Sequence, residues 1–106
     1  MITYSVTVTI EPEIEAEWVE WMSRIHVPDV LRTDCFTECR MQRVLDAPNS
    51  ERIYVMQYDC HSITEYNRYR DEFAAALQKD HADRFAPRFR GSRQLLEQLS
   101  RVQHPG

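Results

Sequence analysis

The fold of this chain is decided by one stretch, RIYVMQYDC, which occupies residues 52–60. In an extended strand successive side chains point to opposite faces, so Ile53 and Val55 share one face. The other face carries Tyr54, Met56, Tyr58 and Cys60. A sheet that helices cover on one side only is usually polar on its open side, yet this strand is apolar on both. The stretch therefore predicts a central strand in a sheet whose two faces are both covered.

Three further segments predict the other strands of this sheet. Residues 35–45 and 52–60 flank the turn-rich run DAPNS, which is typical of a β-hairpin. Residues 2–10 alternate strictly between large, mostly apolar side chains and Thr or Ser, which strongly indicates a strand. The apolar segment 93–99 fits a strand or a helical turn. We favour a strand, because a fourth strand completes the ferredoxin-like arrangement described below.

A first helix is predicted directly after the strand at 2–10. Pro12 suits the first helical position, and the acidic residues that follow it suit the positive end of the helix dipole. One helical face carries the apolar residues Ile14, Trp18, Trp21, Met22 and Ile25. We expect the helix to break at residues 26–28, because Val27 is disfavoured in the α conformation before Pro28.

A second helix is predicted after the hairpin. Ser62 and Glu65 have the spacing of a capping box, in which each side chain binds the other residue's free backbone N–H. The apolar stripe that follows contains Ile63, Tyr66, Tyr69, Phe73 and Leu77. We expect this helix to extend to Lys79 or as far as Phe85, with Pro87 as its end.

The resulting order, βαββαβ, predicts an α+β, ferredoxin-like domain over residues 1–100, with a C-terminal tail at 101–106. Its two helices can cover one face of the antiparallel sheet, and no segment remains to cover the other. Because the strand at 52–60 is apolar on both faces, we expect a second copy of the chain to cover the open face. The prediction is a homodimer in which two sheets pack face to face.

Composition excludes several classes of function. The chain has 106 residues and only two glycines, too few for a dinucleotide-binding or phosphate-binding glycine loop. Its formal net charge of −4 argues against nucleic acid as a partner. We expect no membrane association, since the first residues do not form a signal peptide and no apolar run would span a bilayer. Three cysteines do not fit a secreted disulfide framework, which predicts a cytoplasmic protein.

The chain also resembles a known family. The segments that carry the resemblance are EWVEWM (17–22), HVPDVL (26–31), CFT (35–37), YVMQY (54–58), His81 and Arg84-Phe85. They are similar to a family of short bacterial proteins that is catalogued as a domain of unknown function, over roughly residues 1–100. The resemblance implies a subunit of the dimeric α+β-barrel superfamily, which includes small monooxygenases, haem-degrading enzymes, isomerases and stress-response proteins. It implies no catalytic residues.

Two histidines are the candidate catalytic residues. His26 follows Met22 by four positions, and His81 follows Leu77 by four, so each continues the apolar face of its helix. Histidine titrates near neutral pH and serves as an acid, a base or a ligand. Alternatively, each histidine caps a helix end or binds a carboxylate, Asp29 for His26 and Asp80 or Asp83 for His81.

The candidate ligand-binding residues are Trp18, His26, Arg40, Gln57 and His81. Arg40 and Gln57 are polar at positions where a sheet without contact to water would carry apolar side chains. They would line a pocket between sheet and helices, with Arg40 positioning an anionic group. Alternatively, the strand that holds Arg40 is a charged edge strand. Trp18 would stack on a flat ligand, or pack in the core like most periodic aromatics.

We expect no metal and no cofactor, because the cysteines and histidines lack metal-ligand spacing. The leading hypothesis is a dimeric α+β-barrel protein that binds a small organic molecule between sheet and helices. One alternative is a non-catalytic dimerisation or protein-interaction module with structural histidines. The other is a monooxygenase-like or isomerase-like enzyme.

Overall fold

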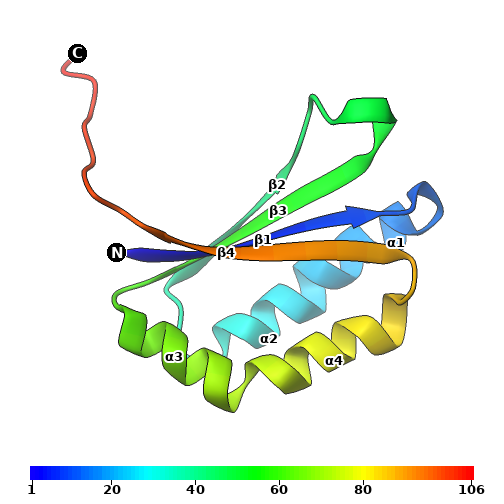
Figure 1. Cartoon of the computed structure of the whole chain (residues 1–106), viewed down its shortest axis with the longest axis horizontal. Helices are drawn as coiled ribbons and strands as arrows, with labels where there is room; N and C mark the ends of the chain where they lie inside the picture. The colour runs from blue at the N-terminus through cyan, green and yellow to red at the C-terminus, as the bar shows by residue number, and fades with distance from the viewer.

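The computed structural model describes all residues, 1–106. An antiparallel four-stranded sheet in the order β2-β3-β1-β4 carries its helices on one face (Figure 1). None of the helices is long and apolar enough to cross a membrane. The strands are β1 (Ile2–Ile10), β2 (Glu38–Arg43), β3 (Arg52–Cys60) and β4 (Phe89–Glu97). The helices are η1 (Pro12–Ile14), α1 (Glu15–Trp21), η2 (Met22–His26), α2 (Val27–Leu31), η3 (Pro48–Ser50), α3 (Ile63–Glu72) and α4 (Ala74–Phe85).

The predicted ferredoxin-like fold is confirmed. β1 pairs with β3 on one side and β4 on the other, so β1 and β3 are the central strands. The C-terminal apolar segment forms a strand, as favoured, but this strand begins at Phe89 rather than at residue 93. The first strand of the hairpin begins at Glu38 rather than at residue 35, because Cys35 and Phe36 are buried in the connection that precedes it. Residues 98–106 contain no helix or strand and lead away from the sheet (Figure 1).

The predicted helix break at residues 26–28 is wrong. α1, η2 and α2 follow one another without a gap, and Val27 keeps helical backbone angles (φ −61°, ψ −46°) although it precedes a proline. The segment η2 is a π-helix, in which the N–H of Val27 donates to the carbonyl of Met22. This wider turn replaces the α-helical turn in which the ring of Pro28 would clash with the carbonyl four residues earlier.

The π-helix also changes which side chains face the sheet. Ile25, expected on the apolar face, is 47% exposed, whereas Met22 is buried and His26 half-buried. A wider turn rotates Ile25 away from the core and leaves His26 above Met22, four positions later. The first helical segment therefore points a histidine, and not an isoleucine, at the sheet.

The second helical segment is two helices, which corrects the expectation of one. Phe73 leaves the helical region (φ −126°), so that α3 ends and α4 begins at this residue. Ser62 is the N-cap residue directly before α3, as expected, but its side chain makes no capping bond and Glu65 lies instead near Arg68. The kink lets α3 and α4 each place residues toward the same sheet (Figure 1).

The core lies between the sheet and the helices. Trp18, Val30, Met56 and Cys60 are its most completely buried side chains. Full burial of an apolar side chain of Val or Met size contributes roughly 1.5–3 kcal/mol. α1 is fixed to the sheet by a hydrogen bond of 2.6 Å from the Tyr54 hydroxyl to the Glu15 carboxylate.

The opposite face of the sheet carries no helix. The register places Thr3, Ser5, Thr7 and Thr9 of β1 on this face. Beside them on β3 lie Ile53 and Val55, which are half-buried without any layer above them. We call this helix-free surface of the four strands the open face.

Candidate functional site

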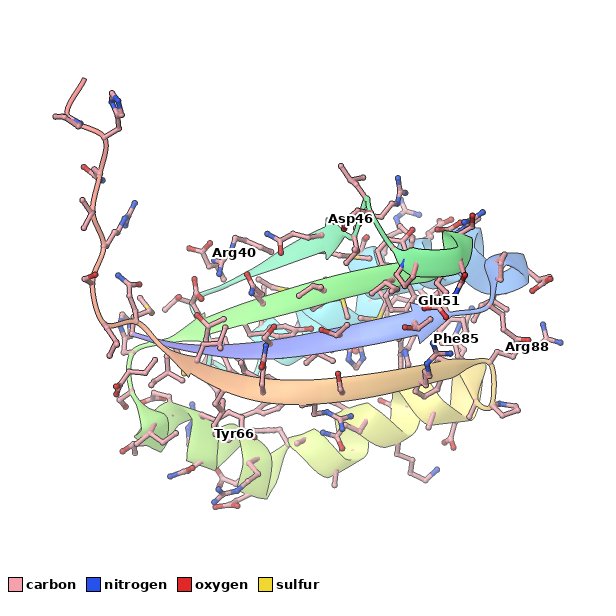
Figure 2. The ribbon with its side chains drawn as sticks, turned by 45° about the horizontal axis from the view of Figure 1, so that its top comes forward. Arg40, Asp46, Glu51, Tyr66, Phe85 and Arg88 are labelled. Atoms are coloured by element: carbon pink, nitrogen blue, oxygen red, sulfur yellow. The ribbon has the colours of Figure 1, made fainter.

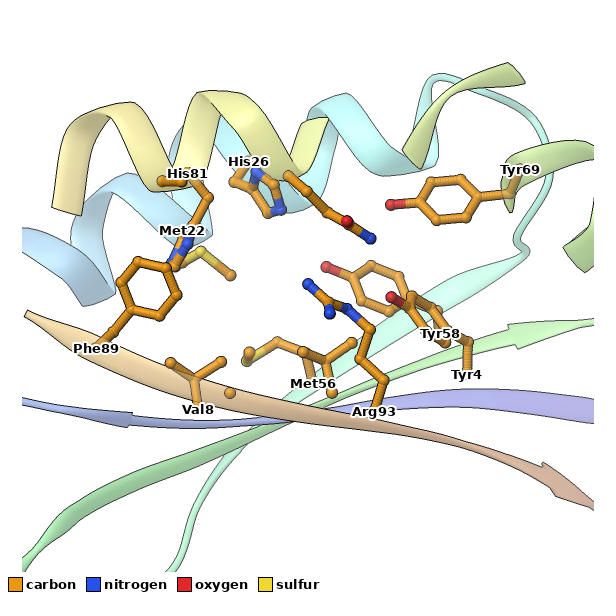
Figure 3. A pocket seen from close by; sticks show the side chains of 14 residues that line it. Tyr4, Val8, Met22, His26, Met56, Tyr58, Tyr69, His81, Phe89 and Arg93 are labelled. Carbon is orange, nitrogen blue, oxygen red and sulfur yellow. The ribbon is translucent and has the colours of Figure 1, made fainter. Parts of the chain in front are cut away.

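A cavity of about 230 Å³ lies between the helix-covered face of the sheet and α1–α4 (Figure 3). Side chains from three strands, the π-helix, α3 and α4 surround it. Its lining residues are Tyr4, Val6, Val8, Met22, His26, Met56, Tyr58, Tyr69, Gln78, His81, Ala82, Phe89, Gly91 and Arg93. Both histidines predicted as candidate catalytic residues therefore face one cavity, although they are far apart in the sequence.

The two histidines lie against each other and against aromatic rings. The ring centroids of His26 and His81 are 5.8 Å apart. His26 stacks on Trp21 at 5.2 Å, and His81 contacts the edge of Phe89 at 4.3 Å. Neither histidine binds the carboxylates that the alternative interpretation assigned to them, since no hydrogen bond or ion pair joins either ring to Asp29, Asp80 or Asp83.

His81 is held by the predicted residue Trp18. The indole N–H of Trp18 donates a hydrogen bond of 2.9 Å to Nε2 of His81. An imidazole that accepts at Nε2 is neutral there and carries its hydrogen on Nδ1. Burial, the neighbouring His26 and the charge of Arg93 lower the pKa of His81 to about 4. Trp18 does not line the cavity itself, so its role is to fix the tautomer and orientation of His81.

His26 differs from His81 in that its nitrogens have no hydrogen-bond partner in the chain. Burial lowers its pKa below the ordinary value, against the opposing charges of Asp29 and Asp80. His26 is therefore neutral at pH 7, and one ring nitrogen is free to accept a proton or a hydrogen bond. Of the two histidines, His26 is the candidate proton acceptor and His81 the candidate N–H donor.

Three tyrosines line the end of the cavity away from His81 and Phe89 (Figure 3). Tyr4 lies 6.0 Å from Tyr58 and 5.8 Å from Tyr69 between ring centroids. Burial raises the pKa of all three hydroxyls, so each remains a protonated O–H donor at neutral pH. This end of the cavity thus offers hydrogen-bond donors, while the other end is mostly apolar.

Arg93 is the cavity residue that sequence reasoning missed. It lies opposite Val6 in the register of β1 and β4, and its guanidinium reaches into the space between sheet and helices (Figure 3). In the sequence it belongs to the basic run Arg84–Arg93, for which a solvated surface is the ordinary interpretation. The alternation of β4 could have found it, because Phe89, Gly91 and Arg93 must share one face.

Arg40 and Gln57, two of the predicted ligand-binding residues, do not line this cavity. They are paired across β2 and β3 and lie on the open face, on the other side of the sheet from Tyr66 and α3 (Figure 2). Arg40 binds both carboxylate oxygens of Asp59, which also accepts a hydrogen bond of 2.8 Å from the Thr3 hydroxyl. Arg40 lowers the pKa of Asp59, so this carboxylate stays ionised and paired.

No group of three or more His, Cys, Asp and Glu side chains is placed to hold a metal ion. All three cysteines are free thiols, and burial raises the pKa of Cys39 to about 11 and that of Cys60 above its ordinary value. The thiols of Cys39 and Cys60 are therefore poor nucleophiles, because the thiolate is the reactive form. The polar groups that line this site are two neutral imidazoles, three phenols, the carboxamide of Gln78 and one guanidinium.

The sequence matches a family model described as Domain of unknown function (DUF4286) over residues 1–99, and the chain belongs to this family. No curated protein matches it. The structure is similar to SnoaB, a cofactor-independent oxygenase from Streptomyces nogalater, with 14% identity, a TM-score of 0.68 and 97% of each chain covered.

Two further solved structures share the fold. HapK from Hahella chejuensis has 12% identity and a TM-score of 0.70, with 100% of both chains covered. A dimeric ferredoxin-like protein from an uncultured marine organism has 15% identity and a TM-score of 0.70, with 98% of this chain and 100% of that chain covered. At such low identities these likenesses show the fold alone.

Proposed function

We propose that this member of the DUF4286 family binds a small, largely apolar organic molecule in the cavity between its sheet and its helices. The observation that carries this proposal is the cavity itself: nine of its 14 lining residues are hydrophobic, and a few polar groups converge on it. Binding sites for small molecules generally combine apolar walls with a few placed polar groups. A protein-interaction module with structural histidines would have no use for such a space.

The size of the cavity limits the ligand. A cavity of roughly 150 Å³ is enough to hold benzene. The volume of about 230 Å³ found here suits one or two fused rings with a short substituent. Phe89, His81 and Tyr58 line the space with flat rings, which favours a flat, aromatic ligand over a branched aliphatic one.

A second candidate function, proton transfer on the bound molecule, is favoured by His26. This neutral imidazole faces the cavity without a partner, whereas a structural histidine would be satisfied by the protein. In an enzymatic reaction of the monooxygenase-like or isomerase-like kind, His26 would accept a proton from the substrate. His81, with its tautomer fixed by Trp18, would donate a hydrogen bond from Nδ1.

We further propose that the chain is a homodimer in which the open faces of two subunits pack together. Ile53 and Val55 support this, because apolar side chains on a face without helices gain from being covered. The fold neighbour from the marine organism is described as dimeric. We also propose that the protein functions in the cytoplasm, where its three free thiols would remain reduced.

Native mass spectrometry tests the binding proposal directly. The chain is purified without added ligand and its mass is compared under native and denaturing conditions. We expect a bound small molecule, or binding of the neutral probe 2-naphthamide, that is lost in a Gly91→Val variant whose added side chain enters the cavity. A protein that carries no small molecule and binds the probe no better than this variant would refute the proposal.

A further inference from the structure

We propose that the molecule bound in the cavity is an organic anion, whose charged group lies against the Arg93 guanidinium between the tyrosine hydroxyls and the apolar end. This inference rests on the proposed binding function and adds the charge and the orientation of the ligand. Arg93 then has the role that the sequence predicts for Arg40.

The charge of the cavity lining favours an anionic ligand. No aspartate or glutamate lines the cavity, and with both histidines neutral the guanidinium of Arg93 is its one formal charge. The cavity is thus positive within a chain whose formal net charge is −4. A cationic ligand would be repelled there, and a neutral one would leave the guanidinium without a counter-ion.

Arg93 has no acidic partner in the chain, and the polar group beside it is the Tyr4 hydroxyl. Most other arginines of the helices and strands are held by carboxylates, as Arg52 is by Glu15 and Arg90 by Glu51. Arg93 forms no ion pair, although Arg90 on the same strand does. A guanidinium presents several N–H donors in a planar fork that matches carboxylate geometry. The protein supplies the donors at this position and leaves the acceptor to the ligand.

Hydroxyl groups and apolar side chains surround Arg93. Arg93 pairs with Val6, and two positions along the sheet from this pair lie Tyr4 and Tyr58 in one direction and Val8 and Gly91 in the other. The hydroxyls of Tyr4, Tyr58 and Tyr69 are donors, and they face the same space as the guanidinium (Figure 3). An oxyanion in this place would accept from both kinds of donor, and a hydrogen bond in which one group is ionised is roughly twice as strong as a neutral one.

The arrangement also fixes the orientation of the ligand. The anionic group points to Arg93 and the tyrosines, while the rings of the ligand extend toward Met22, His81 and Phe89. The charge of Arg93 extends to this apolar end, where it lowers the pKa of His81. Neutralising the guanidinium with a bound anion would remove that effect, so ligand binding and the protonation of His81 are linked.

The test compares two probes of the same shape, 2-naphthoate and 2-naphthamide, by quenching of tryptophan fluorescence in the wild-type chain. We expect naphthoate to bind about tenfold tighter or more, a difference of about 1.4 kcal/mol. In Arg93→Gln this preference should be lost, because naphthoate binding weakens much more than naphthamide binding. The matched control is Arg90→Gln, on the open face of the same strand, which should keep the preference.

The outcomes separate the two proposals. If the wild type binds both probes equally, the anion inference is refuted and the binding function stands. If Arg93→Gln keeps the preference for naphthoate, the role of Arg93 is refuted. If neither probe binds and no small molecule is carried by the purified chain, the proposed function fails together with this inference.

Discussion

The indole nitrogen of Trp18 lies 2.9 Å from Nε2 of His81, and this hydrogen bond joins α1 to α4 across 63 positions of the chain. It fixes which nitrogen of His81 carries the hydrogen and holds the ring against the cavity. A core aromatic residue thereby becomes part of the site, although its ring belongs to the hydrophobic core.

Replacing Trp18 with phenylalanine should raise the pKa of His81 from about 4 toward its ordinary value of 6.5. The change removes the N–H that stabilises the neutral ring and admits more solvent. Loss of the hydrogen bond and of ring volume should also cost about 2 kcal/mol of unfolding free energy. Titration of the histidine ring protons by NMR measures the pKa. In Trp21→Phe, where no such bond is broken, the His81 pKa should change less.

The protein should lose stability as the pH falls from 6.5 toward 4. In the unfolded chain His81 takes up a proton near pH 6.5, whereas the folded chain binds it only near pH 4. Within this window the unfolded state binds more protons, so acidification favours unfolding. The free energy of unfolding should fall by at most about 1.4 kcal/mol per pH unit. The actual decrease should be smaller than this limit, because the His81 ring is partly exposed to solvent.

Urea denaturation at several pH values measures this dependence. A His81→Gln variant should show a flatter profile between pH 6.5 and 4, because it lacks the group that is protonated on unfolding. Substitution of the exposed His61 with glutamine is the matched control and should leave the profile unchanged. A His81→Gln profile as steep as that of the wild type would contradict the prediction.

The Gly91→Val substitution should block the cavity without disturbing the fold. Gly91 faces the cavity, and a Cβ atom built there would meet its nearest neighbour, the Thr7 carbonyl oxygen, at 3.4 Å, an ordinary contact. A β-branched residue suits a strand, and its methyl groups would occupy the ligand's space. Probe binding should fall at least tenfold while the thermal midpoint stays within a few degrees. Ser92→Val, on the open face, should bind the probe like the wild type.

The Val55→Lys substitution should dissociate the proposed dimer. It places a charge in the centre of the open face, where a second sheet would have to bury it at high cost. Light scattering should report about 25 kDa for the wild type and 12.7 kDa, the mass of one chain, for the variant. Leu45→Lys, in the exposed hairpin turn, should remain dimeric. A wild-type chain that scatters as a monomer at micromolar concentration would contradict the proposal.

The fold could be predicted because its strands follow a period of two. The alternation over residues 2–10 and 52–60 fixes which side chains face the helices, and the observed register agrees with it. The π-helix and the kink at Phe73 could not be predicted in this way. Both are small departures from regular helix geometry, and neither leaves a sequence pattern as clear as an alternating strand.

The residues of the site could be predicted only where their positions follow from the apolar face of a helix. His26 and His81 continue apolar stripes, and both line the cavity. The prediction for Arg40 failed because it depended on the register of β2, where a shift of one residue moves every side chain to the other face. The irregular start of the hairpin, where Cys35 and Phe36 precede β2, hides that register in the sequence.

The π-helix between Met22 and His26 makes the cavity depend on chain length as much as on residue type. The π-helix closes its hydrogen bond over one residue more than an α-helix does, so removing one residue from this segment would restore the α-helical turn in which the ring of Pro28 clashes with the carbonyl four residues earlier. The helix would have to bend at Pro28, and the placement of His26 over the cavity would change with it. The position of this histidine is thus set by the number of residues in the segment, which no substitution alters.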